Sequence, residues 1–314
     1  VEGDRAYTMF DEFSNRDRPY LRTMPDGTQR HIDEMNTEEA IAFLDTCSPG
    51  RPFSVSISFS STHAEDSDLE NHYPCIDEVK GLYENTVFPA PRLGAPEIFD
   101  NQPEFLKNSL NRTRYFWRWD TPDKYQKNMR GYYRLIAGVD VMMKRVLDEL
   151  EARGLADNTV IIYMADNGYY MGDRGFAGKW SHYEESFRVP LIVYDPRITA
   201  TGGRTVDALA TNLDIAPTLL ELAGLAPPDH YQGRSLVPFL RGEPLPDWRT
   251  EFFVEHRWDG DDIPKWEGVR TTTHMYARYD GQSPPYEMLH DLQSDPDELK
   301  NLAEVPTYRD VLTA

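Results

Sequence analysis

The fold class follows from the stretch Thr159-Val-Ile-Ile-Tyr-Met-Ala-Asp-Asn-Gly168. Its first seven residues form a short apolar run, typical of a strand buried on both faces of a parallel sheet. Asp166 and Asn167 follow at the carboxyl end of this strand, where doubly wound sheets bind ligands. A carboxylate and an amide carbonyl are hard oxygen donors that suit Ca²⁺ or Mg²⁺. Asp-Asn-Gly is also ordinary turn chemistry, so a capped turn is the alternative.

Helices and strands alternate on both sides of this stretch. Apolar residues at helical spacing predict helices over 37–46, 127–153 and 214–224. Strands are predicted over 53–60, where apolar and polar residues alternate, and over 189–194. This order predicts an α/β fold with a mixed, mostly parallel sheet sandwiched by helices.

The pattern changes after Pro246. Short antiparallel strands are predicted over 251–255, 268–273 and 275–279, and a charged tail follows Asp295. We therefore expect an α/β domain over residues 1–248 and a small antiparallel C-terminal α+β subdomain over 249–314.

Composition excludes several classes of partner. The 314 residues carry a net charge of −20, whereas a nucleic-acid binder needs a basic face, and an anionic membrane is an equally poor partner. No window approaches the 18 apolar residues of a transmembrane helix, and the first residues have no signal-peptide pattern. Two cysteines, Cys47 and Cys75, are too few for a disulfide framework, although they could form one bridge.

Four longer motifs carry a family resemblance. They are Ala165-Asp-Asn-Gly-Tyr-Tyr-Met-Gly-Asp-Arg-Gly-Phe-Ala-Gly-Lys179, which continues to Val193, Leu213-Asp-Ile-Ala-Pro-Thr-Leu-Leu-Glu-Leu-Ala-Gly224, Gln232-Gly-Arg-Ser-Leu236, and Leu289-His-Asp-Leu-Gln-Ser-Asp-Pro-Asp-Glu-Leu-Lys-Asn-Leu302. Through them most of residues 36–303 resembles the sulfatases of the alkaline phosphatase superfamily. The resemblance implies the sulfatase fold, hydrolysis of an aryl or carbohydrate sulfate ester, and a periplasmic or extracellular setting.

The resemblance also implies site residues. Asp166 and Asn167 match ligands of the family's single divalent cation, usually Ca²⁺, with Mg²⁺ as the alternative. Lys179 matches a lysine that contacts the sulfate, and a glycine-rich loop would let its ammonium fold back over the strand end. A solvated surface lysine is the alternative.

His63 ends the strand predicted over 53–60 and matches a histidine that contacts the sulfate or the leaving oxygen. As imidazolium it could donate a proton to that oxygen. Thr62, Ala64 and Glu65 depart from the family's Pro-His-x-Pro pattern, and a strand-end histidine bonded to backbone is the alternative. His182 is expected to belong to the loop rather than to the site. A glycosylation sequon at Asn111-Arg-Thr113 would matter only in a eukaryotic secretory route.

The pentapeptide Cys47-Ser-Pro-Gly-Arg51 matches the C-x-P-x-R pattern in which sulfatases mature a cysteine to formylglycine. Its surroundings disagree with the family, because a strand follows at once, no Asp-Asp pair precedes it, and it lies just before the strand that ends at His63. We interpret this match as coincidental. Formylglycine is then expected in an N-terminal segment outside this sequence, and the chain alone is expected to be inactive. The rival hypotheses are a phosphodiester or phosphonate monoester hydrolase of the same superfamily and a non-catalytic cation-binding remnant.

Overall fold

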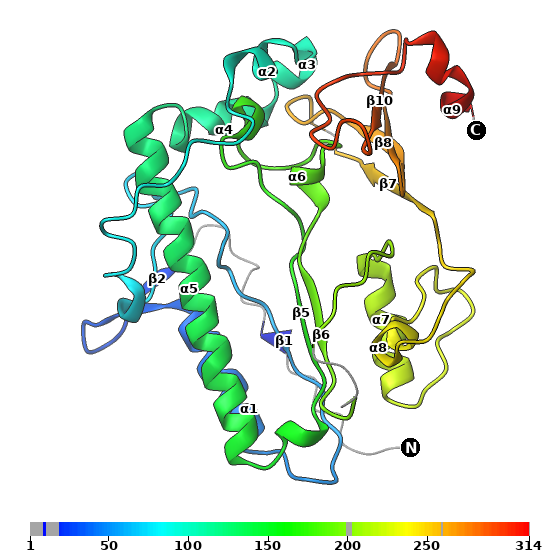
Figure 1. The fold of residues 1–314 in the computed structure, drawn as a ribbon. Helices are drawn as coiled ribbons and strands as arrows, with labels where there is room; N and C mark the ends of the chain where they lie inside the picture. The colour runs from blue at the N-terminus through cyan, green and yellow to red at the C-terminus, as the bar shows by residue number, and fades with distance from the viewer. Residues whose placement is uncertain (1–8, 11–18, 199–202, 259, 314) are drawn as a thin grey trace. The chain divides into compact units, whose positions relative to one another are not determined.

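The structure, a computed structural model, describes residues 9–10, 19–198, 203–258 and 260–313. The chain divides into two units, and Figure 1 labels their helices and strands. Unit 1 comprises Val1–Ala90 and Phe116–Thr159, and unit 2 comprises Pro91–Tyr115 and Val160–Ala314.

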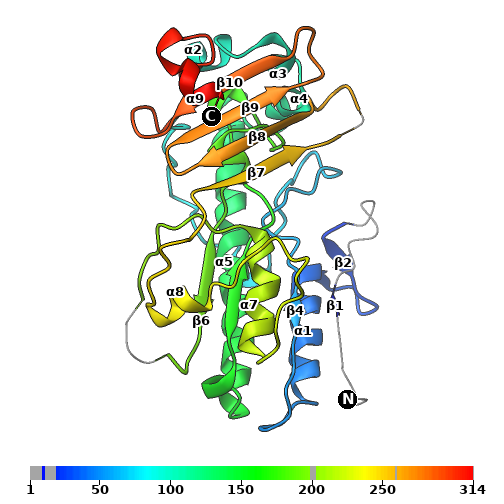
Figure 2. The same ribbon diagram turned by 90° about the vertical axis from the view of Figure 1, so that its right-hand side faces the viewer.

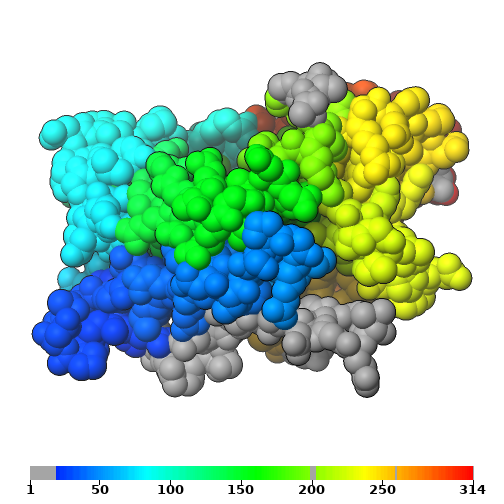
Figure 3. All heavy atoms as spheres, turned by 90° about the horizontal axis from the view of Figure 1, so that it is seen from below, coloured from blue at the N-terminus to red at the C-terminus, as the bar shows by residue number. Residues whose placement is uncertain are grey.

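Unit 1 is built on two helices that pack together, α1 (Ile32–Leu44) and α5 (Pro122–Ala152). Figure 3 shows their atoms meeting, α1 in blue and α5 in green. Both helices start earlier than apolar spacing predicts, because polar caps mark their first turns. His31 forms a capping box with Glu34 at α1, and Thr121 accepts a hydrogen bond from the Lys124 N–H at α5.

The strands of unit 1 are short. β2 (Leu21–Thr23) and β3 (Gln29–His31) form an antiparallel pair, and β1 (Met9–Phe10) runs parallel to β4 (Ser56–Ile57). Only two residues of the strand predicted over 53–60 therefore join a ladder in the described part of the chain. Short 3₁₀ turns, η1 (Asp77–Val79) and η2 (Ala156–Asn158), complete the unit.

Unit 2 contains the antiparallel sheet predicted near the C-terminus. Its order is β10 (Tyr286–Asp291), β9 (His274–Tyr279), β8 (Trp266–Thr271) and β7 (Glu251–His256), as Figure 2 shows. β10 escaped prediction because its residues do not alternate strictly between apolar and polar. The sheet lies inside the subdomain expected over 249–314, whereas the boundary at residue 248 stays a prediction.

One face of this sheet forms the core of unit 2. Alternate residues of β9 are buried, and they pack with aromatic residues of the segment between β5 and β6. The buried members of this core are Leu106, Tyr170, Phe176, Tyr183, Trp266, Met275, Ala277, Tyr279 and Met288. The C-terminal sheet thereby supports the loop that carries Lys179.

The central strands differ from the prediction. β5 (Ile161–Met164) and β6 (Leu191–Tyr194) pair antiparallel, and neither strand is buried. Parallel pairing needs a crossover, usually helical, but the connection between them contains only η3 (Asp173–Gly175) and the four-residue α6 (Glu184–Phe187). The expectation of a mostly parallel sheet is thus wrong for this pair, and among the described residues the single parallel pair is β1 with β4.

Further elements surround these sheets. Unit 2 also holds α2 (Pro96–Asp100), α3 (Glu104–Lys107), η4 (Asn212–Asp214), α7 (Ile215–Leu222), α8 (Val237–Arg241), η5 (Pro306–Tyr308) and α9 (Arg309–Thr313), while α4 (Leu110–Arg118) begins in unit 2 and ends in unit 1. α7 confirms the helix predicted over 214–224. None of the helices in the described ranges has the length and apolar character needed to cross a membrane.

Candidate functional site

Asp166 and Asn167 lie directly after β5, at its carboxyl end as predicted. Asp166 is exposed and Asn167 is half-buried. The Asn167 amide Nδ2 donates to the Gly168 carbonyl at 2.8 Å, so the amide presents its Oδ1 as an acceptor. The Gly168 N–H donates to the Ser186 carbonyl at 2.8 Å, and a Cβ at Gly168 would lie 2.1 Å from the carbonyl oxygen of Glu185. Glycine is therefore required to dock this strand end against α6.

The donor set fits a hard divalent cation in kind. Asp166 supplies a carboxylate and Asn167 an amide oxygen, the ligand types that Ca²⁺ and Mg²⁺ prefer. Within the described ranges, no group of three or more His, Cys, Asp or Glu side chains is placed to hold a metal ion. Since Ca²⁺ takes six to eight oxygens, these two residues account for part of a coordination shell.

Lys179 lies on the same connection, between β5 and α6. Three glycines of the loop, Gly172, Gly175 and Gly178, have φ values of 94°, 68° and 102°, which favour glycine. Their chain reversals return residue 178 to residue 170, where the Tyr170 N–H donates to the Gly178 carbonyl at 3.0 Å. Lys179 is half-buried after this reversal.

His63 lies in unit 1, on a turn held by a buried carboxylate. Asp33 accepts hydrogen bonds from the Ser60 N–H and hydroxyl, both at 2.7 Å, and from the Ser61 N–H at 2.9 Å. His63 Nδ1 lies 2.7 Å from the Ala64 carbonyl oxygen, which can only accept, so Nδ1 carries a proton. Proton exchange with a substrate would then use Nε2.

Asp166, Asn167 and Lys179 thus lie on one connection of unit 2. His63 belongs to unit 1.

Cys47 lies beyond the C-terminal end of α1. Its thiol donates to the Phe43 carbonyl at 3.6 Å, and its side chain packs against the cluster formed by Leu44, Leu150 and Leu155. The turn that carries His63 is bonded to Asp33 at the opposite end of the helix, about 20 Å away for a 13-residue helix. Cys47 and Cys75 are both free thiols.

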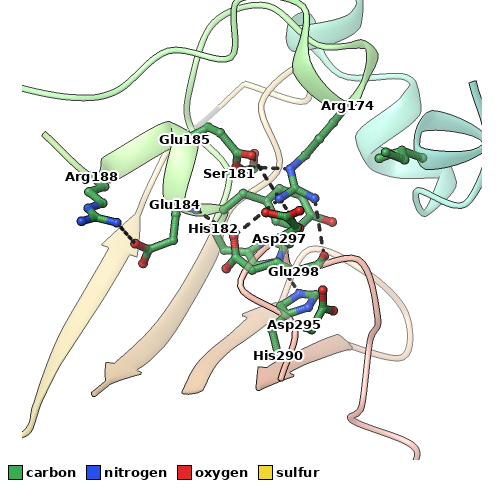
Figure 4. Close-up of polar contacts among 12 residues, drawn as sticks. Arg174, Ser181, His182, Glu184, Glu185, Arg188, His290, Asp295, Asp297 and Glu298 are labelled. Carbon is green, nitrogen blue, oxygen red and sulfur yellow. Dashed lines mark hydrogen bonds and ion pairs between the residues drawn. The ribbon is translucent and has the colours of Figure 1, made fainter. Parts of the chain in front are cut away.

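A buried ionic cluster ties the lysine loop to the C-terminal motif (Figure 4). Arg174 donates to Glu185 Oε2 at 3.2 Å and to the Asp297 carbonyl at 2.7 Å, and its guanidinium stacks 3.8 Å from the Tyr183 ring centroid. Glu298 is 1% exposed and accepts from the Glu184 N–H at 2.9 Å. Burial raises the pKa of Glu298 to about 8. The sequence gives no periodic signal for this cluster, because its members come from segments more than 100 residues apart.

His182 is a core residue, although sequence reasoning expected an ordinary loop residue. Its Nδ1 lies 2.7 Å from the Tyr279 hydroxyl and its Nε2 3.1 Å from Nε2 of His290. Burial holds the pKa of His182 well below its usual range and lowers the pKa of His290 to about 4. Both rings are therefore neutral at physiological pH.

Two family models match the chain. The model described as sulfatase matches residues 4–225, and the model described as N-sulphoglucosamine sulphohydrolase, C-terminal, matches residues 172–314. An N-acetylglucosamine-6-O-sulfatase of Bacteroides thetaiotaomicron is 27% identical over 87% of this chain and 58% of its own length. The chain spans between 55% and 58% of the length of the first three curated relatives that it matches.

Solved structures share the fold. A protein whose structure was solved in complex with its substrate D-glucosamine-2-N,6-O-disulfate matches with a TM-score of 0.74 and 25% identity, over 92% of this chain and 69% of that one. A phosphonate monoester hydrolase of Silicibacter pomeroyi matches with a TM-score of 0.73 and 24% identity, over 98% of this chain and 64% of that one.

Proposed function

Because the chain belongs to the sulfatase family, we propose that it forms part of an enzyme that hydrolyses an aryl or carbohydrate sulfate ester. The observation that carries this proposal is the connection between β5 and α6. It holds two oxygen donors, Asp166 and Asn167, and a half-buried lysine, Lys179, on backbone fixed by glycines. A cation and an ammonium are the groups that a sulfate with its non-bridging oxygens would require.

Each residue has a distinct role in this proposal. Asp166 and Asn167 bind the divalent cation, Ca²⁺ or Mg²⁺. Lys179 contacts a non-bridging sulfate oxygen, where its fixed charge balances negative charge that grows during transfer. His63, protonated on both nitrogens, gives the Nε2 proton to the leaving alcohol oxygen as the sulfur–oxygen bond breaks. Its Nδ1 proton stays on the ring, in the hydrogen bond to the Ala64 carbonyl.

The nucleophile is proposed to come from residues outside this sequence. In the family, a formylglycine supplies the attacking oxygen and the bound cation supplies positive charge at the sulfate. Cys47 is a poor source of that group here, because it follows a helix, packs against apolar side chains and lies at the opposite end of α1 from the His63 turn.

The test uses the full-length protein with an aryl sulfate ester. We expect Lys179→Ala to lower kcat by about 10² to 10³, the usual cost of removing one charge-stabilising donor. Lys144→Ala is the matched control, because Lys144 is exposed on α5 and pairs with Asp148 one turn away. Unchanged turnover in Lys179→Ala would contradict the assigned role.

The second candidate is hydrolysis of phosphonate monoesters, favoured by the match to the Silicibacter pomeroyi enzyme. That likeness concerns the fold, which therefore does not separate the two reactions. Comparing kcat/KM for an aryl sulfate and an aryl phosphonate monoester separates them, and a ratio in favour of the phosphonate would replace the sulfatase proposal. Absence of turnover with both esters would support the non-catalytic alternative.

A further inference from the structure

The backbone on both sides of Lys179 adopts conformations that side chains rarely favour. Gly178 has a φ of 102°, and Trp180, a bulky residue, has a φ of 79°. A residue held in such a region costs free energy and persists only when its surroundings fix it. Lys179 therefore sits between two unusual peptide units, and the contacts that maintain them determine where its side chain begins.

Asn111, in the first turn of α4, makes several of these contacts. Its Nδ2 donates to the Lys179 carbonyl at 2.6 Å, and its backbone carbonyl accepts from the Ala177 N–H at 2.9 Å. Its Oδ1 packs so closely on Gly178 that a Cβ there would lie 2.7 Å away. Asn111 is 3% exposed, so these contacts form in a dry environment where a lost partner is costly.

A second contact comes from the C-terminal sheet. Trp266, the first residue of β8, donates from Nε1 to the Trp180 carbonyl at 2.7 Å. The carbonyls of residues 178, 179 and 180 are thus bonded to Tyr170, Asn111 and Trp266, respectively. All of these residues belong to unit 2.

We propose that Asn111 is a positioning residue for Lys179, holding the strained turn at 178–180 so that the ammonium is presented in one place. Asn111 acts through the loop backbone and does not touch substrate. The catalytic consequence rests on the proposed function, whereas the restraint of Lys179 does not.

Lysine reactivity tests the restraint directly. In the full-length protein we would measure acetylation of Lys179 by acetic anhydride with peptide mass spectrometry, using the exposed Lys144 as internal standard. Asn111→Asp keeps the side-chain size but turns a carboxylate toward the Lys179 carbonyl. We expect acetylation of Lys179 to change about tenfold, the factor for loss of one restraining hydrogen bond, with Lys144 unchanged. An unchanged rate would overturn the proposal.

Two further variants sharpen the test. Thr113→Val alters an exposed residue of the same helix and should leave the acetylation rate of Lys179 unchanged. If Thr113→Val changed this rate as much as Asn111→Asp does, general loosening of α4 would explain the effect, and the proposal would be overturned. If Asn111→Asp fails to fold, Asn111→Ser replaces it, because it removes the Nδ2 donor to the Lys179 carbonyl with a smaller, uncharged side chain. The same shift in Lys179 reactivity is expected, and an unaltered rate would overturn the proposal.

Turnover separates this inference from the proposed function. We expect Asn111→Asp to lower kcat about tenfold in the wild-type background and to have no further effect in Lys179→Ala. Equal losses in both backgrounds would show that Asn111 does not act through Lys179. If Lys179→Ala itself leaves kcat unchanged, the proposed function fails, and the acetylation rates still decide the restraint.

Discussion

At the scale of single residues, unit 2 buries two groups whose pKa values are shifted in opposite directions, Glu298 upward and His290 downward. Glu298 holds its proton up to about pH 8 in the folded protein, but releases it near pH 4.5 when unfolded. The folded state thus binds more protons across this window, and the stability from Glu298 is lost as pH rises through 8. His290, with its pKa lowered to about 4 by burial, loses its contribution as pH falls from 6.5 toward 4.

We therefore predict that Glu298→Gln becomes more stable relative to wild type as pH rises from 5 to 9. The free energy of unfolding from urea titrations at pH 5, 7 and 9 measures this difference. Glu304→Gln, at an exposed glutamate, should give a flat difference over the same range. A Glu298→Gln difference that is equally flat would mean that Glu298 is ionised in the folded state beside Arg174.

Gly178 provides a second prediction at this scale. Gly178→Ala should destabilise the protein by about 1 kcal/mol or more, because an alanine at positive φ is strained and its Cβ would meet Asn111 Oδ1. Thermal unfolding measures the loss. Gly81→Ala is the control, since nothing lies within 4 Å of a Cβ there and its φ lies outside the left-handed region, so its stability should be close to wild type. Equal stability of the two variants would contradict the described turn.

At the scale of elements, α1 fixes the turn that carries His63 through one carboxylate. We predict that Asp33→Ala lowers the free energy of unfolding by about 3 kcal/mol, because two backbone N–H groups and a hydroxyl lose a buried, charged partner. Urea unfolding measures the change. Glu39→Ala, at an exposed acid of the same helix, should stay within about 0.5 kcal/mol of wild type.

The other end of α1 gives the next prediction. Cys47→Ala in the full-length protein should leave turnover nearly intact and cost about 1 kcal/mol of stability or less, because the thiol is half-buried in a small apolar cluster. Steady-state kinetics and thermal unfolding check both parts. An aldehyde found at Cys47 by mass spectrometry would make it the nucleophile.

Elements with strong periodicity could be predicted, and those fixed by distant partners could not. Helix α7 and strands β7 to β9 follow local spacing and turn residues. The starts of α1 and α5 depend on single capping residues, His31 and Thr121, which apolar spacing ignores. The direction of β6 depends on a connection without a crossover helix, so its apolar composition misled the prediction.

At the scale of the whole molecule, cation binding tests what these 314 residues contain. We predict that calorimetry on this chain finds Ca²⁺ binding on the order of 1 mM or weaker, since Asp166 and Asn167 offer two of the six to eight oxygens that calcium takes. Tight Ca²⁺ binding by the chain would mean that other residues complete the coordination shell.

The chain alone should also fail to hydrolyse an aryl sulfate, whereas the full-length protein should turn it over.

The candidate site shows the same division between local and distant information. Asp166, Asn167 and Lys179 occupy one continuous motif, and sequence reasoning proposed all three. Asn111 lies 68 residues before Lys179, and only the fold brings its amide to the lysine carbonyl. No spacing rule connects two such positions, because their contact depends on how α4 docks against the loop.

The burial of Asn111 has a consequence for how the protein is made. Asn111-Arg-Thr113 is an acceptor tripeptide for N-linked sugar, which is attached while the nascent chain is still unfolded. A glycan on that nitrogen could not enter a site where the side chain is 3% exposed, and it would occupy the atom that donates to the Lys179 carbonyl. Protein secreted from yeast or animal cells would then be misfolded or have a displaced Lys179, whereas protein made in bacteria would not. The choice of expression host therefore affects the structure of the site.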